Sequence, residues 1–177
     1  SYSRSCQRRR GNNKLKSHKI TLNVNGTQYT ASADPRMTLL DFLRDVLKLT
    51  GTHMGCEHGV CGACSINTEG NAVRACLMLA VQAQGLNIKT VEGLCEDDGS
   101  PGILQDAFRD AHGLQCGYCT SGMLVAADAL LHTTPNPTDD EIREAIGGNI
   151  CRCTGYAQII ESIQLASERL RGGLSHE

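Results

Sequence analysis

The chain has 177 residues, which suits one or two compact domains, and its ten cysteines fall short of the density of a disulfide-built miniprotein. It carries 17 basic and 19 acidic side chains, but seven of the basic ones lie in residues 1–19, where no acidic residue occurs. Residues 20–177 are therefore acidic, with 10 basic against 19 acidic side chains, which argues against nucleic acid as a partner.

Residues 1–17 form a polar, basic tail. Arginine pairs such as those in residues 8–10 can belong to an export signal, but no apolar segment follows Arg10. We therefore expect a flexible or processed tail and a cytoplasmic protein. No run of about 18 apolar residues occurs in the chain, so the sequence predicts no membrane span.

Residues 18–94 are predicted to form a small α+β domain. Alternating apolar residues indicate strands at 19–24 and 27–31, joined by Asn25-Gly26, a strong hairpin signal. Thr38 is a suitable N-cap for the apolar residues at helical spacing that follow it. The remaining expected elements are a helix over 38–48, a hairpin of strands 64–68 and 72–76, a short apolar turn or helix over 77–83, and a strand over 87–91.

Residues 95–102 are polar and rich in turn-forming residues, and they are predicted to be a linker. Every element expected after the linker is helical. Thr138 and Glu141 have the spacing of a capping box, which opens one of these helices. Helices of this length with short loops are typical of a small four-helix bundle. The predicted helices cover 103–112, 120–132, 138–146 and 156–170, in a domain that spans 103–171 and is followed by a tail over 172–177.

Four cysteines of the first domain have the spacing of iron–sulfur ligands. Their C-x4-C-x2-C pattern is that of plant-type [2Fe–2S] clusters, and nearby glycines permit the tight turns that such a loop needs. Zinc favours paired C-x2-C units, of which only one occurs here, so zinc and unligated thiols are the weaker alternatives. The predicted ligands are Cys56, Cys61, Cys64 and, from the neighbouring strand, Cys76; the turn glycines are Gly55, Gly59 and Gly62; and His58 is expected to be a solvated loop residue.

Four more cysteines lie in the helical region, as a C-x2-C pair and a C-x-C pair that are 31 residues apart. Two helices that fold back on each other would bring the pairs together, and four converging thiolates indicate a site for a soft metal. The spacing matches no zinc-finger pattern. The predicted ligands are Cys116, Cys119, Cys151 and Cys153, whereas Cys6 and Cys95 have no partner at ligand spacing and are expected to be free thiols.

Three motifs give the chain a family resemblance. They are GCEHGVCGAC at residues 55–64, QCGYCTSGM at 115–123 and GNICRCTGY at 148–156. Together they closely resemble the iron–sulfur subunit of xanthine oxidase family molybdenum hydroxylases, over about residues 18–170. Members of that family include aerobic carbon monoxide dehydrogenases, aldehyde oxidoreductases and N-heterocycle hydroxylases. This chain departs from the family at Ser121, where proline is common, and we expect only a modest change in local turn rigidity.

The resemblance implies a β-grasp ferredoxin-like domain followed by a four-helix domain, each holding one [2Fe–2S] cluster. It also implies that Gln115 and Cys153 contact molybdopterin on a separate large subunit, with molybdenum and in the cytosine dinucleotide form. FAD would be carried by a medium subunit near the first cluster, and the complex would be a dimer of heterotrimers.

The expected function is electron transfer from molybdenum through the second and then the first cluster to FAD. This chain offers no catalytic residues of its own, because it lacks a nucleophile–base pair and a phosphate-binding loop. Two alternatives stay open, a freestanding two-cluster ferredoxin and a zinc-binding interaction module. The substrate of the complex stays open too: carbon monoxide, an aldehyde or an N-heterocycle.

Overall fold

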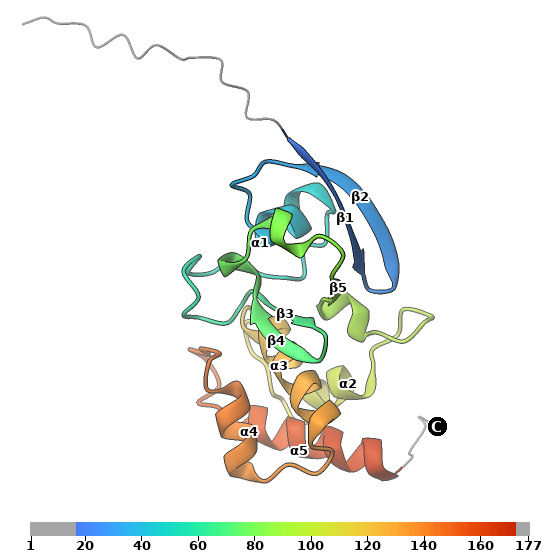
Figure 1. Ribbon diagram of the computed structural model, residues 1–177. Coiled ribbons are helices and arrows are strands. Elements are labelled where there is room, and N and C mark those ends of the chain that lie inside the picture. Colours follow the sequence, from blue (N-terminus) through green and yellow to red (C-terminus); the bar gives the residue numbers. More distant parts are fainter. Residues whose placement is uncertain (1–16, 173–177) are drawn as a thin grey trace, which may run out of the picture.

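The computed structural model describes residues 17–172, which form a sheet domain followed by a helical domain (Figure 1). The predictions for the tails, including Cys6, lie outside the described residues. No helix among residues 17–172 is both long and apolar enough to cross a membrane.

The first domain is built on a mixed five-stranded sheet with the order β2-β1-β5-β3-β4. The predicted Asn25-Gly26 hairpin is confirmed, and both residues have the positive φ that a tight two-residue turn requires (51° and 77°). β5 runs parallel to β1 and antiparallel to β3. The strands are β1 (His18–Val24), β2 (Thr27–Ala33), β3 (Ser65–Thr68), β4 (Asn71–Arg74) and β5 (Asn87–Lys89).

The helix expected over 38–48 is present only in part. Thr38 caps α1 (Leu39–Asp41) as predicted, but the chain then widens into a π-helical segment, η1 (Phe42–Val46). The amide of Leu47 donates to the carbonyl of Phe42, five residues back. Such turns are rare, and apolar spacing cannot separate them from an α-helix. The segment supplies buried side chains to the core of the sheet domain, namely Leu39, Leu40, Phe42 and Leu43.

Short 3₁₀ turns replace the end of two predicted strands. The second strand of the 64–76 hairpin stops at Arg74, so Cys76 lies in η2 (Ala75–Leu77) and not on a strand as predicted. The strand expected over 87–91 stops at Lys89 and is followed by η4 (Val91–Leu94). The apolar segment over 77–83 contains η3 (Ala80–Ala83). A strand and a 3₁₀ turn both place apolar residues against the core, so the pattern did not distinguish them.

The second domain contains the four expected helices among its described residues. The capping box at the start of α4 is confirmed, since Thr138 Oγ1 accepts from the Glu141 amide. Its core includes the large buried side chains of Phe108, Met123 and Ile159, and Val91 and Leu94 of η4 pack against it. The helices are α2 (Ile103–Asp110), α3 (Thr120–Thr133), α4 (Asp139–Ile146) and α5 (Ala157–Gly172).

The two domains meet where α3 packs against β3 and β4 (Figure 1). Ile66 belongs to the core of the sheet domain, whereas its neighbours Ser65 and Asn67 point to the other face of the sheet and are buried as well. β3 is therefore covered on both faces, although alternation in such a strand usually leaves one face to solvent.

Candidate metal centres

The first cysteine loop curls so that its backbone amides point at sulfur. The amides of Val60 and Cys61 both lie 3.3 Å from Cys56 Sγ. Gly59 and Gly62 have φ of 86° and 74°, a region that other residues enter only with strain. Amides that donate to thiolate sulfurs stabilise the negative charge of an iron–sulfur site.

Cys64 and Cys76 complete this set from the buried side. The Ala75 amide donates to the Cys64 carbonyl at 3.2 Å, which fixes η2 beside the loop. Both side chains are buried. Cys76 therefore reaches the loop from a turn, although sequence reasoning placed it on a strand.

The local environment gives the thiols of the first set different pKa values. The Cys61 amide, followed by that of His58, lowers the pKa of Cys56 to about 6. Burial raises the pKa of Cys76 to about 11, and the neighbouring Cys64 thiol adds to the effect. Desolvation disfavours the charged thiolate and donated hydrogen bonds favour it, so the half-buried Cys56 ionises more readily than the buried Cys76.

The second set joins the start of α3 to the loop between α4 and α5. Cys116 Sγ and Cys153 Sγ are 3.5 Å apart. Cys151 is held from both sides: its amide donates to Tyr156 Oη at 2.9 Å, and its Sγ lies 3.2 Å from Thr154 Oγ1. The two cysteine pairs, distant in sequence, thus meet as the helical prediction required.

The second set shows the same division of thiol acidity. The Tyr118 amide, with the Cys153 side chain, lowers the pKa of Cys116. Burial raises the pKa of Cys119 to about 12. Burial also acts against the Cys151 thiolate, but the Thr154 hydroxyl and amide outweigh it and lower the pKa. The Cys116 side chain raises the pKa of Cys153.

The residues present fit iron–sulfur ligation. All nine cysteines of residues 17–172 are free thiols, so sulfur is available at every predicted position. The thiols lie beside one another in pairs, Cys56 with Cys61, Cys64 with Cys76, Cys119 with Cys151 and Cys116 with Cys153. Soft thiolates with amides aimed at them suit an iron–sulfur group.

The other residues singled out from the sequence lie at the surface. Gln115 is exposed beside Cys116. His58 is exposed, and its Nδ1 contacts the Cys56 carbonyl. Cys95 is exposed and accepts from Gln105 Nε2 at 3.5 Å.

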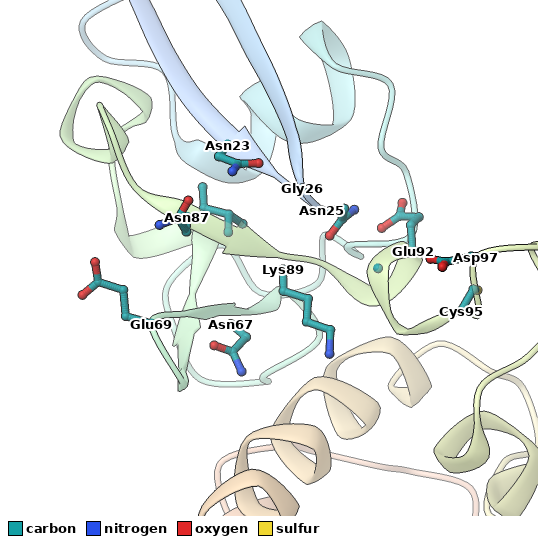
Figure 2. Close-up of a pocket in the computed structure, with 12 residues that line it drawn as sticks. Asn23, Asn25, Gly26, Asn67, Glu69, Asn87, Lys89, Glu92, Cys95 and Asp97 are labelled. Atoms are coloured by element: carbon teal, nitrogen blue, oxygen red, sulfur yellow. The ribbon is translucent and has the colours of Figure 1, made fainter.

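A polar cavity of about 520 Å³ opens among the sheet-domain strands and the η4 region (Figure 2). Asn23, Asn25 and Asn87 line it, with Cys95 at its edge, and none of the eight predicted ligands is among its lining residues. Two of its polar side chains are used within the fold: Asn25 exchanges hydrogen bonds with Thr90, and the Lys89 ammonium bonds Asp128 at 3.1 Å. We therefore place the candidate site at the cysteines.

Sequence reasoning missed the residues that join the two cysteine loops. Tyr118, within the C-x2-C pair, stacks on His53 with ring centroids 5.0 Å apart, and its hydroxyl donates to the Met54 carbonyl. Ser121 is buried, and its Oγ lies 3.3 Å from His53 Nδ1, so the position where the family often has proline takes part in this contact. The one signal in the sequence is the position of Tyr118 and Ser121, within and just after the C-x2-C pair.

Two family models match the chain. Residues 22–85 match a 2Fe-2S iron-sulfur cluster binding domain, and residues 90–164 match a [2Fe-2S] binding domain. The two matches together cover both cysteine sets.

Similar proteins carry the comparison further. The gamma subunit of caffeine dehydrogenase from a Pseudomonas species is 54% identical, over 86% of this chain and 93% of that protein. The small subunit of nicotine 6-hydroxylase from Paenarthrobacter nicotinovorans is 53% identical, over 81% and 86%. A chain of quinoline 2-oxidoreductase from Pseudomonas putida 86 superposes with a TM-score of 0.84 at 48% identity, covering 89% of this chain and 98% of that one. The chain therefore belongs to the iron–sulfur small subunits of the xanthine oxidase family of molybdenum hydroxylases.

Proposed function

We propose that the chain passes electrons from a molybdenum cofactor on a large subunit to FAD on a medium subunit, by way of two [2Fe–2S] clusters. The clusters would supply one-electron redox chemistry, held by Cys116, Cys119, Cys151 and Cys153 and by Cys56, Cys61, Cys64 and Cys76. The observation that carries this proposal is the pair of four-cysteine sites within one fold, each with backbone amides near its sulfurs.

Exposed apolar side chains at the first site suit a protein partner. Val60, in the ligand loop, and Leu77, next to Cys76, are 56% and 66% exposed. Apolar side chains beside a redox centre are suited to excluding water when a partner docks. We propose that this surface meets the FAD-binding subunit.

The second site has a comparable surface. Leu114 and Ile150 are 39% and 51% exposed; the exposed Gln115 follows Leu114, and the exposed Cys153 lies three residues after Ile150. We propose that these residues meet the large subunit, with Gln115 and Cys153 at the molybdopterin, which we expect in its cytosine dinucleotide form. A dimer of heterotrimers remains our proposal for the complex.

We further propose that the complex oxidises an aromatic N-heterocycle and works in the cytoplasm. Caffeine, nicotine and quinoline, for which three similar proteins are named, are all N-heterocyclic compounds. Free thiols throughout the described residues suit a reducing compartment.

Reductive titration of the purified complex, followed by low-temperature EPR, tests the electron-transfer role. We expect two distinguishable S = 1/2 signals, together with iron and sulfide in equal amounts. A single signal, or a colourless protein containing zinc, would contradict the proposal. Reduction of the same complex by candidate N-heterocycles, with aldehydes as the comparison, tests the substrate class.

A further inference from the structure

The two cysteine loops touch directly, through a backbone hydrogen bond and through the short side chain of Asn149. The Ile150 amide donates to the Cys61 carbonyl at 2.9 Å, and Asn149 Nδ2 donates to the Gly62 carbonyl at 3.1 Å. We call this contact between residues 61–65 and 148–150 the seam. It joins Cys61 of the first ligand set to Ile150, the residue directly before Cys151 of the second set.

Glycines allow the two loops of the seam to approach each other this closely. A Cβ atom on Gly62 would lie 2.6 Å from the Gly148 carbonyl oxygen and 2.8 Å from Asn149 Cα. A Cβ on Gly122 of α3 would collide with the Gly62 carbonyl. No side chain can fit between the loops at these points, so the two backbones can approach this closely only because glycines stand there.

Arg74, the last residue of β4, donates hydrogen bonds to both sides of the seam. Its Nη1 donates to Ser65 Oγ at 2.6 Å, and its Nη2 donates to the Gly148 carbonyl at 2.6 Å and to Asn149 Oδ1 at 3.3 Å. Ser65 Oγ also donates to the Gly62 carbonyl at 2.6 Å. One planar guanidinium thus bonds both loops at once, a geometry that the point charge of lysine cannot reproduce.

We propose that Arg74 is a positioning residue that fixes the separation of the two cluster sites by bonding both ligand loops. The part of this proposal that concerns electron transfer rests on the function proposed above. Electron transfer between two centres falls steeply with their distance, so a seam that opened and closed would make the rate between them variable. The hydrogen bonds of Arg74 go to Ser65, Gly148 and Asn149 and not to the sulfur atoms of the predicted ligands, so Arg74 acts through the loops.

The test compares three variants in the intact complex. Arg74→Met removes every donor and keeps an apolar stem. Arg74→Lys keeps the charge and one donor group. Arg36→Met is the matched control, because Arg36 is 79% exposed and pairs only with Asp34 at 3.5 Å among the ion pairs of the described residues.

The first readout is hydrogen exchange in peptides that contain Ile150 or residues 61–65. Loss of hydrogen bonds to a charged group should speed exchange at the seam by about tenfold or more in Arg74→Met, and by less in Arg74→Lys. Exchange in β1, β2 and α5 should match the wild type, and Arg36→Met should leave the seam unchanged. The second readout is EPR of the fully reduced complex, in which magnetic coupling between the two signals should weaken in Arg74→Met.

Seam exchange that is unchanged in Arg74→Met at full iron content would overturn the proposal. So would a rise spread evenly over both domains in Arg74→Lys, since that indicates a general loss of stability. If Arg74→Met does not fold, Arg74→Lys decides: faster exchange confined to the seam supports positioning, and wild-type exchange refutes it. Absence of two EPR signals in the wild type would contradict the proposed function alone, because the exchange experiment does not depend on it.

Discussion

Gly62 shows most directly what a single residue contributes to the seam. Its φ is 74°, and a Cβ there would meet the Gly148 carbonyl at 2.6 Å. Gly62→Ala should therefore cost the left-handed backbone strain, about 1–2 kcal/mol, and a further amount of about 1–3 kcal/mol for overpacking. Urea unfolding of the chain measures the sum.

Gly85 provides the control for Gly62→Ala. Its φ is 80°, but a Cβ there would meet nothing within 4 Å. Gly85→Ala should lower the free energy of unfolding only by the backbone strain, about 1–2 kcal/mol. Equal losses of stability in the two variants would mean that the loops have room to separate at Gly62.

Cys153→Ser should remove the helical-domain cluster and leave the first one in place. Cys153 is exposed, and the seam is formed by other residues, so the Cys61 loop keeps its contacts with Gly148–Ile150. Iron content should fall by about half, because each [2Fe–2S] cluster needs four cysteines, and one of two EPR signals should disappear. Loss of both signals would mean instead that the first cluster depends on the second.

At the residue scale, the sequence indicates candidate ligands but not the residues that support them. Cys56, Cys61 and Cys64 stand out because they lie on one loop at the spacing of plant-type clusters, and the second set stands out as a C-x2-C and a C-x-C pair between predicted helices. Arg74 and Asn149 are 75 positions apart, and nothing in either segment indicates that they meet. Only the fold reveals such a pair.

Among the elements, α4 illustrates a helix whose start is fixed locally. Thr138 Oγ1 accepts from the Glu141 amide, and Glu141 Oε2 accepts from the Thr138 amide at 2.7 Å. Thr138→Ala should cost about 1 kcal/mol in thermal unfolding. Thr133→Ala, which removes a hydroxyl that bonds the carbonyls of Ala129 and Leu130 within α3, should change stability by less than about 0.5 kcal/mol. A similar loss of stability in both variants would contradict the capping role of Thr138.

The same cap makes the stability of α4 depend on pH, and the pKa shift of Glu141 gives the direction of the change. The Thr138 amide, followed by its hydroxyl, lowers the pKa of Glu141 below its usual range. Stability from this bond is therefore present above the unfolded-state pKa of glutamate, and it is lost as the pH falls through the lowered value. Unfolding of the wild type and of Glu141→Gln, measured from pH 7 downward, should converge in acid; curves that stay parallel would contradict this assignment.

Elements with local signals were predicted well, and those shaped by packing were not. The Asn25-Gly26 hairpin and the α4 cap depend on adjacent residues, so the sequence alone indicates them. The π-helical turn of Phe42–Val46 and the 3₁₀ turn that holds Cys76 keep the same apolar side chains against the core as a helix or strand would. Tertiary contacts select between these alternatives.

At the scale of the whole molecule, the two domains share a buried boundary. β3 is buried on both faces, with Ile66 in the sheet-domain core and Ser65 and Asn67 on the side of the sheet that α3 covers. Separating the domains would expose Ser65 and Asn67 together with the seam carbonyls, and buried polar groups that lose their partners are costly. The two domains should therefore stay together even without a covalent link.

Cleavage within the connecting loop tests this expectation. Residues 95–100 are all exposed, so a protease site inserted between Asp98 and Gly99 can be cut without disturbing the core. The two fragments should co-elute from a size-exclusion column in native buffer and separate in urea, with both EPR signals retained before urea is added. As a control, the same nicked chain carrying Gly122→Ala, whose new Cβ would collide with the Gly62 carbonyl, should separate at lower urea. Fragments that part in native buffer would show that the domains are held together mainly by the loop.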